Sequence, residues 1–233
     1  MLGSILLLAL TAPALARCGP DSLEQAKLES ITLDGDLILA DSRKLRLAGL
    51  FLGEGGLFLG EAGLKARLKP GDAVAVGLLS ETKDRWSRYP AIVFTLSGTG
   101  APQWLQERLL RDGQALARPE ESLGDCWVLL KNAEASRRVK SPERAPEGGR
   151  FARIEGRVQR VSEGRSAHFI TLFDASNTRV TGLIQKRHLK RFSDAGVDVA
   201  QLRSHFIRLR GVRSVRNASV IPLTMADQIE IVR

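Results

Sequence analysis

Alternating apolar and polar positions predict β-strands through the first hundred residues. The segment "SITLDGDLILAD" (30–41) has apolar alternation on either side of Asp34-Gly35-Asp36. Asp-Gly between two alternating runs is a hairpin signal. Three more strands are predicted, in "RKLRLAGLFL" (43–52), "DAVAVGLLS" (72–80) and "YPAIVFTL" (89–96).

Helical spacing marks three further segments in this half. They cover Glu61–Leu68, Pro102–Asp112 and Asp125 to about Val139. Lys69-Pro70-Gly71 ends the first and Gly113 ends the second. The third has apolar residues three and four positions apart, which form its expected inner stripe: Cys126, Leu129, Leu130 and Ala133. Lys131, Glu134 and Arg138 fall outside that stripe and are expected to face solvent.

A charged, Pro- and Gly-rich stretch, "RRVKSPERAPEGGR" (137–150), marks a linker. Beyond it come three alternating segments, a helical stretch "KRHLKRFSDAGVD", and three short alternating segments. This is the order of an OB-fold, a small Greek-key barrel with a helix after its third strand. The predicted organisation is therefore a first domain at 17–139, a linker at 140–150 and an OB-like domain at 151–233. The predicted fold class is mainly β, with barrels and a few helices.

The N-terminus resembles a secretory signal peptide. The apolar run Leu2–Leu10 is too short to span a bilayer, and Ala14-Leu15-Ala16 is a small-x-small cleavage signal. Cleavage after Ala16 predicts an exported, periplasmic protein. A lipoprotein anchored through Cys18 is the alternative, but Arg17 occupies a position that normally holds a small residue. No other segment is apolar enough to cross a membrane, so the mature chain is expected to have no transmembrane segment.

The chain has two cysteines, Cys18 and Cys126. An even count in an exported chain favours pairing, and we predict a Cys18–Cys126 disulfide. Two buried free thiols are the alternative. The two cysteines and three scattered histidines have no zinc-ligand spacing.

Charge is distributed unevenly between the two halves. The chain has a net charge of +9 and a pI near 10.1, which indicates anionic partners. Residues 137–233 contain 20 Lys and Arg against 9 Asp and Glu, a net +11, whereas residues 1–136 contain 15 against 17. A basic series recurs at helical spacing in the second half and is either a solvated face or a nucleic-acid-binding surface: Lys186, Arg187, Lys190 and Arg191.

Three segments of the first half occur in the order found in one known family. "DGDLILADSRKLRLAGL" (34–50), "DRWSR" (84–88) and "WLQERLLRDGQALA" (104–117) together resemble the staphylococcal nuclease (thermonuclease) family. The resemblance covers roughly Ile31–Val139. The second half, Phe151–Arg233, is similar to the C-terminal extension of exported bacterial relatives.

The resemblance implies an OB-type barrel with calcium-dependent phosphodiesterase activity on DNA or RNA. In that family two aspartates and a carbonyl hold Ca²⁺, a glutamate activates water, and two arginines bind the phosphate. Such residues suit the chemistry, because in-line attack builds negative charge on the phosphate oxygens and Ca²⁺ prefers oxygen ligands. The matching positions are Asp36 for the first calcium aspartate, Arg46 and Arg88 for the arginines, and Glu54 for the glutamate.

The chain departs from the family pattern at the metal site. Phe51 stands at the second calcium aspartate and cannot bind a cation, so the resemblance implies an incomplete Ca²⁺ site. Gly53 replaces a rigid proline in the loop that carries Glu54. Trp86 and Ser87 stand where the family has Tyr and Gly.

Two functional hypotheses follow. The first is a divergent metal-dependent nuclease that uses Arg46, Glu54 and Arg88. The second is a catalytically inactive homologue that binds nucleic acid or another anionic envelope component, with Arg85 and Trp86 among its candidate contacts. A purely structural envelope role is a third. The alternative for the site residues is structural: Arg46 paired with Asp36 or Glu54, Arg88 at the surface, and Glu54 as an ordinary loop carboxylate.

Overall fold

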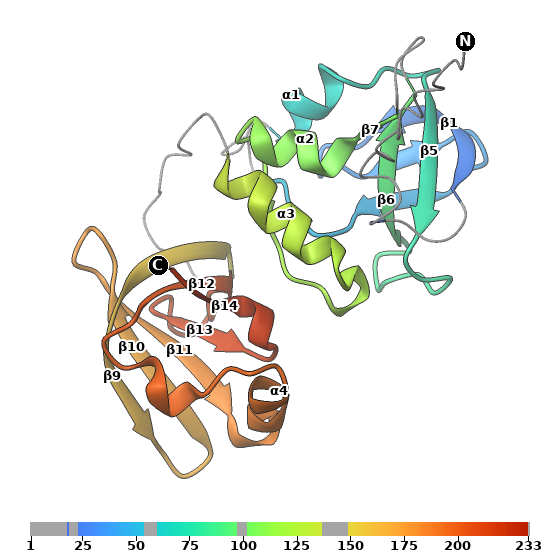
Figure 1. Ribbon diagram of the computed structural model, residues 1–233. Helices are drawn as coiled ribbons and strands as arrows, with labels where there is room; N and C mark the ends of the chain where they lie inside the picture. Colours follow the sequence, from blue (N-terminus) through green and yellow to red (C-terminus); the bar gives the residue numbers. More distant parts are fainter. Residues whose placement is uncertain (1–17, 19–22, 54–59, 97–101, 137–148, 233) are drawn as a thin grey trace, which may run out of the picture. The chain divides into compact units, whose positions relative to one another are not determined.

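The computed structural model describes residues 18, 23–53, 60–96, 102–136 and 149–232 (Figure 1). The described chain forms two compact units. The first unit contains the residues up to Gln114 and those from Glu120 to Ser136, and the second contains Ala115–Pro119 and the residues from Gly149 onward. The predicted mainly β fold is confirmed. Among the described residues, no helix is both long and apolar enough to cross a membrane.

Five strands of the first unit close into a barrel. They are β1 (Glu24–Ile31), β2 (Leu37–Leu39), β3 (Lys44–Leu47), β5 (Ala73–Leu78) and β6 (Tyr89–Thr95). β1, β2 and β3 form a meander, β3 pairs in parallel with β6, and β5 joins β6 back to β1. This strand order is that of an OB-type barrel. The first unit also has two short strands, β4 (Leu50–Phe51) and β7 (Gln103–Trp104), whereas the short strand β8 (Leu116–Ala117) belongs to the second unit.

The predicted period-two pattern fixes which residues fill this barrel. Leu37 and Leu39 of β2, and Leu45 and Leu47 of β3, are buried, whereas Arg46 between them lies on the outer face. The predicted Asp34-Gly35-Asp36 turn connects β1 and β2. Gly35 has a φ of +80°, a left-handed conformation that glycine adopts without steric cost.

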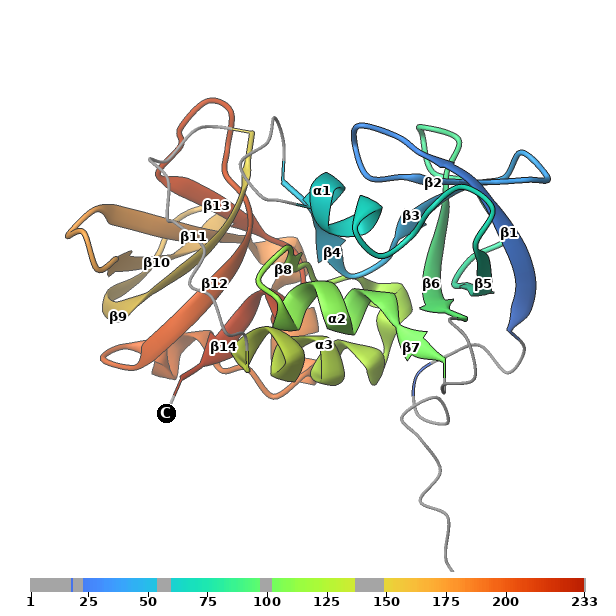
Figure 2. The same cartoon turned by 90° about the horizontal axis from the view of Figure 1, so that it is seen from above.

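Three helices belong to the first unit: α1 (Gly60–Lys65), α2 (Leu105–Arg111) and α3 (Cys126–Ala135). α2 and α3 lie side by side in both views (Figures 1 and 2). The predicted helix at Pro102–Asp112 starts later than expected. Gln103–Trp104 form strand β7, because they pair with the end of β6 and Trp104 stacks against Phe94 at 6.3 Å between ring centroids.

The expected exposure of Glu134 is wrong. Glu134 is only 1% exposed. It lies four positions after the buried Leu130, and residues at this spacing share one face of a helix. Trp127 also belongs to this buried face, while Leu129 is only partly buried.

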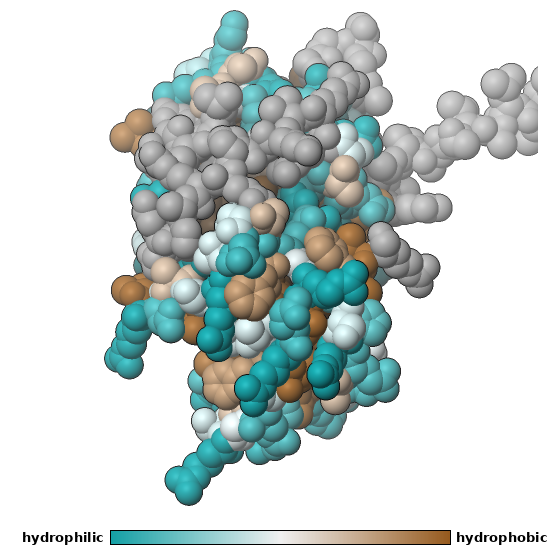
Figure 3. Space-filling model, turned by 90° about the vertical axis from the view of Figure 1, so that its left-hand side faces the viewer, coloured by the Kyte–Doolittle hydropathy of each residue, from teal (hydrophilic) through white to brown (hydrophobic). Residues whose placement is uncertain are grey.

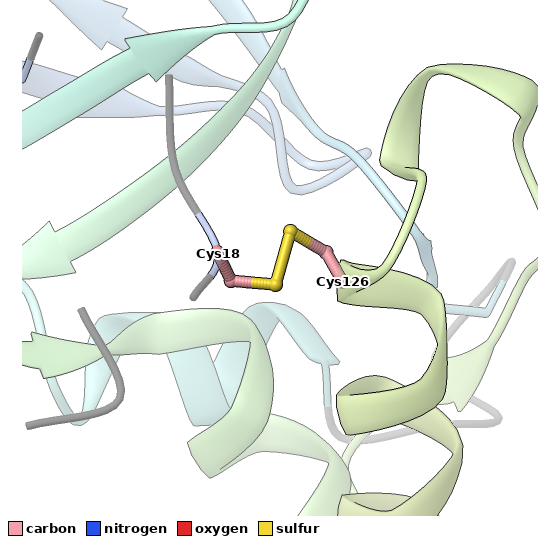
Figure 4. The surroundings of a disulfide bond; sticks show 2 residues. All are labelled: Cys18 and Cys126. Atoms are coloured by element: carbon pink, nitrogen blue, oxygen red, sulfur yellow. A yellow bond between two sulfur atoms is a disulfide. The ribbon is translucent and has the colours of Figure 1, made fainter. Parts of the chain in front are cut away.

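Cys18 and Cys126 form the predicted disulfide (Figure 4). Their Cα atoms are 5.1 Å apart, within the range that a disulfide spans, and both residues are buried. The bond attaches the segment before β1 to the first residue of α3, 108 positions later.

The second unit repeats the OB order with longer strands. β9 (Phe151–Glu163), β10 (Ala167–Phe173) and β11 (Arg179–Gln185) form a meander, followed by α4 (Leu189–Asp194), β12 (Phe206–Val212), β13 (Val220–Leu223) and β14 (Ile229–Ile231). β11 pairs in parallel with β13, and β12 pairs with β9. Short 3-10 turns lie at Glu121–Leu123 in the first unit and at Lys186–His188, Val199–Leu202 and Ala226–Gln228 in the second. Phe192 of α4 is buried with the barrel core.

Candidate functional site

The structure brings Arg46 and Arg88 together around Asp84. Arg46 projects from the outer face of β3, and Arg88 lies just before β6, the strand that pairs with β3. Arg88 Nε donates to Asp84 Oδ2 at 2.9 Å, and Arg46 Nε lies 3.7 Å from the same oxygen. Two arginines of a phosphate site would have to converge in this way, but here a carboxylate occupies the meeting point.

The main partner of Arg46 is Glu120, which sequence reasoning missed. Arg46 Nη1 and Nη2 donate to the two carboxylate oxygens of Glu120 at 2.6 and 2.9 Å. Gly49 N also donates to Glu120, at 3.1 Å. Among the described residues, the hydrogen-bonded side-chain partner of Arg46 is therefore not the expected Asp36 but a residue 74 positions away. Glu54 itself lies outside the described residues.

Gly49 is required at this position for two reasons. Its φ of +76° is left-handed, and a Cβ there would lie 2.4 Å from Leu130 Cδ1. The tight turn after β3 thus lets the backbone reach Glu120 while α3 packs against it.

Arg46 remains a cation in these surroundings. Burial alone would lower the pKa of Arg46, but the hydrogen bonds that it donates to Glu120 and the negative charges of Glu120 and Asp84 raise it above its ordinary value. A bidentate guanidinium–carboxylate pair of this kind is among the stronger polar interactions in proteins.

Asp36 lies in a second set of ion pairs at the start of β2. Arg88 Nη1 donates to Asp36 Oδ1 at 3.2 Å. Lys44 Nζ lies 3.1 Å from Oδ2, in an ion pair without hydrogen-bond alignment. Asp36 is only 3% exposed, so its charge is compensated by these two cations rather than by water.

The residues described around Asp36 do not fit a calcium ion. Ca²⁺ takes six to eight oxygen ligands, several of them carboxylate. Both oxygens of Asp36 face cationic side chains, and the next family ligand position is Phe51. In the part of the chain that the structure describes, no three His, Cys, Asp or Glu side chains gather as a metal site.

Together these residues form what we call the charge cluster: Asp36, Lys44, Arg46, Asp84, Arg88 and Glu120. Three cations are matched by three carboxylates within ion-pair distance. A phosphate diester could bind Arg46 and Arg88 only by displacing carboxylates that already bind them. Five ion pairs thus connect the residues of the charge cluster within the first unit.

Asp84 also builds the loop between β5 and β6. Its Oδ1 accepts from the backbone N–H groups of Trp86 at 2.9 Å and Arg88 at 3.1 Å. This side-chain turn holds Ser87 at a φ of +60°, in the left-handed region. The rest of the loop is therefore presented in a defined conformation.

Arg85 and Trp86 lie at the tip of this loop. Both are exposed, and Trp86 is 54% accessible. The Arg85 guanidinium lies 3.8 Å from the centroid of the Trp86 ring, and Arg88 lies 4.7 Å from it. The loop thus exposes a stacked cation and aromatic ring.

Replacing Asp84 with Asn is expected to flatten the acid dependence of stability. Burial raises the pKa of Asp84, but hydrogen bonds from Arg88 and the backbone more than offset this and lower it below the ordinary 3.8. A lowered pKa stabilises the fold above pH 3.8, and this contribution is lost as the pH falls through the folded value.

Urea unfolding at pH 7 and at pH 3 measures this effect. Asp84→Asn should be less stable than wild type at pH 7, with the difference shrinking on acidification. Asp34→Asn is the control, because Asp34 is exposed and Asn-Gly forms the same type of turn. An equal loss for Asp84→Asn at both pH values would contradict the assignment.

The basic series of the second unit lies on exposed positions after β11. Lys186 pairs with Glu163, Lys190 Nζ lies 3.0 Å from Asp194, and Arg187 Nε lies 3.3 Å from His188 Nε2. Arg191 is exposed on α4. At least two of these four cations are therefore already offset by carboxylates.

No protein-family model and no curated protein matches the sequence. Among solved structures, the chain is similar to a murine DNA-binding protein bound to double-stranded DNA (TM-score 0.33, 9% identity, covering 91% of this chain and 99% of that one). It is also similar to the p204 HINb domain (TM-score 0.30, 9% identity, covering 90% and 95%) and to the cytoplasmic molybdate-binding protein ModG (TM-score 0.17, 11% identity, covering 82% and 96%). At these TM-scores the likeness is loose, and the OB assignment rests on the strand order of each unit.

Proposed function

We propose that this chain is an exported nucleic-acid-binding protein, derived from a thermonuclease-like ancestor, whose first barrel binds without cleaving. The observation that carries the proposal is the exposed Arg85–Trp86 stack on the β5–β6 loop. Aromatic rings and guanidinium planes stack on nucleobases, and the positive charge attracts phosphate.

The position of this loop in the fold supports the proposal. β5 and β6 are the fourth and fifth strands of the barrel, so their connection corresponds to one of the two loops with which OB-folds bind oligonucleotides. The tip of the loop, Arg85-Trp86, presents a cation and an aromatic ring, which are two of the side-chain types that such binding uses. The net charge of +11 in residues 137–233 adds a long-range attraction for polyanions.

The competing hypothesis is a nuclease that uses Arg46 and Arg88. Their convergence on Asp84 favours it, because a phosphate could take the place of that carboxylate. The charge balance of the cluster disfavours it, since displacing Asp84 and Glu120 would leave carboxylates beside an incoming phosphate. We therefore assign these arginines to the stability of the barrel.

Export is part of the proposal. The predicted signal peptide lies outside the described residues, and cleavage after Ala16 would leave Cys18 as the second residue of the mature chain. The Cys18–Cys126 disulfide is compatible with an oxidising compartment such as the periplasm. An anionic envelope polymer is the alternative ligand.

Removing the stack should weaken binding of a single-stranded oligonucleotide by about tenfold or more, since base stacking is worth about 1–3 kcal/mol per base. The variant is Arg85→Ala/Trp86→Ala, and fluorescence anisotropy measures Kd. Lys69→Ala is the matched control, because it removes one exposed cation from the same unit and leaves the aromatic.

A salt series separates the contributions. Loss of Arg85 should reduce the slope of log K against log salt by about 0.7. An Arg85→Ala/Trp86→Ala variant with wild-type affinity would refute the assignment. Equal competition by dextran sulfate, which has charge but no bases, would favour the anionic envelope polymer.

A further inference from the structure

A row of exposed side chains crosses four strands of the second unit. Phe206 on β12 is directly opposite Arg157 on β9, which is opposite Phe173 on β10, which is opposite Arg179 on β11. Directly paired residues point to the same face of a sheet. Aromatic and cationic side chains therefore alternate along one line, which we call the Phe–Arg row. β9, β10 and β11 lie side by side in Figure 1.

The four side chains lie on the outer face of the barrel. Their neighbours along the strands are core residues: Val158, Leu172, Val180 and Ile207 are buried in the hydrophobic cluster. Alternation then directs the row outward. All four are exposed, with Phe173 at 38% and Phe206 at 42%. Figure 3 shows one face of the molecule, on which hydrophobic and hydrophilic residues are interleaved.

No carboxylate of the described residues pairs with the two cations of the row. Arg157 Nη1 donates to the carbonyl of Ser204 at 2.9 Å. Within the residues that the structure describes, neither Arg157 nor Arg179 makes an ion pair. Arg208 is the next residue after Phe206 on the same face of β12. It differs because it binds Glu155 at 2.7 Å and Glu230 at 2.8 Å.

A third basic position lies next to the row. A β-bulge between Val158 and Arg160 shifts the register, and Arg160 lies opposite Thr171, the next outward residue of β10 after Phe173. Arg160 is exposed and also makes no ion pair in the described part of the chain. Three cations thus surround Phe173 on one face.

We propose that the Phe–Arg row is a second nucleic-acid site, specific for single strands. Bases stack on Phe173 and Phe206, while Arg157, Arg160 and Arg179 bind the intervening phosphates. The two rings are two strand spacings apart, roughly 10 Å, with a guanidinium between them. Stacking on a phenyl ring requires an unpaired base, so a duplex cannot make these contacts. The choice of nucleic acid as ligand rests on the proposed function, but the site is independent of the Arg85–Trp86 loop.

The test is the affinity of the full chain for a labelled single-stranded DNA and for the same sequence as a duplex. Phe173→Leu/Phe206→Leu keeps apolar side chains on the strands but removes the rings, and it should weaken single-strand binding by about tenfold or more. Duplex binding should be unchanged. Val215→Ala/Ile231→Ala, which trims two other exposed apolar residues of this unit, should match wild type.

The contribution of the arginines is measured separately, from the salt dependence of binding. Arg157→Gln/Arg179→Gln should lower the salt slope for single strands by about 1.4, or about 0.7 for each cation. Thermal unfolding of each variant confirms that the barrel is intact. Wild-type single-strand affinity in the folded leucine variant, or equal losses for single strand and duplex, would overturn the row as a stacking site.

The outcomes also separate this inference from the proposed function. If wild type binds no nucleic acid, both fail. If wild type binds and only the Arg85→Ala/Trp86→Ala variant loses affinity, the proposed function stands and the second site is refuted.

Discussion

Replacing both cysteines with serine is expected to lower the free energy of unfolding by about 3–5 kcal/mol. The Cys18–Cys126 bond closes a loop of 108 residues, and cross-links that close long loops restrict the unfolded chain most. The bond also fixes the otherwise terminal segment to α3. Urea or guanidinium unfolding of the oxidised wild type and of Cys18→Ser/Cys126→Ser measures the difference.

The control uses reductant. Reduced wild type should unfold at the same denaturant concentration as the double variant, and reductant should not change the variant. Equal stability of wild type with and without reductant, with reduction verified by thiol titration, would contradict the prediction.

Glu120→Ala is expected to cost about 3 kcal/mol. It leaves the largely buried guanidinium of Arg46 without its bidentate partner and removes the acceptor of the Gly49 N–H. Breaking a buried ion pair by deleting one member is far more costly than losing an exposed one. Denaturant unfolding at pH 7 measures the loss.

Glu24→Ala is a closely matched control. Glu24 binds Arg43 through two bonds of 2.8 Å in the same unit, but its side chain is 59% exposed. Its loss should therefore cost less than about 1 kcal/mol. The double replacement Arg46→Met/Glu120→Leu should recover part of the loss, because neither charge of this pair is then left without its partner. Equal costs for Glu120→Ala and Glu24→Ala would show that Glu120 is not a buried structural partner.

Local patterns predicted much of the fold. The Asp34-Gly35-Asp36 turn, the strands around it and the order of three strands, helix and strands after Phe151 are all present. Local patterns failed where distant contacts decide the structure. Gln103–Trp104 became a strand because β6 offers an edge to pair with, and helical propensity alone does not include that partner.

Less of the candidate site could be predicted from the sequence. A family-like pattern located Arg46, Arg88 and Asp36, but their partners depend on three-dimensional contacts. Glu120 follows Pro119 in a polar stretch, and no local signal connects it with a strand 74 residues earlier. The Phe–Arg row could not be predicted from the sequence for the same reason. The alternation within each strand shows which residues face outward, but only the register of four paired strands places these residues in one row.

We propose that Arg46 and Arg88 serve the first barrel as part of a structural charge cluster, and that the chain binds nucleic acid without cleaving it. Cleavage and binding of nucleic acid differ in their need for calcium. A nuclease of the thermonuclease family needs Ca²⁺, whereas stacking and phosphate contacts from arginines do not.

The most direct test follows binding and cleavage of one labelled single-stranded oligonucleotide by the mature, oxidised chain, in Ca²⁺ and in chelator. We predict the same Kd in both conditions and an oligonucleotide of unchanged length after prolonged incubation. Arg46→Ala/Arg88→Ala provides the background for cleavage. Shortening of the oligonucleotide that requires Ca²⁺ and disappears in that double variant would contradict the account and identify the charge cluster as an active site.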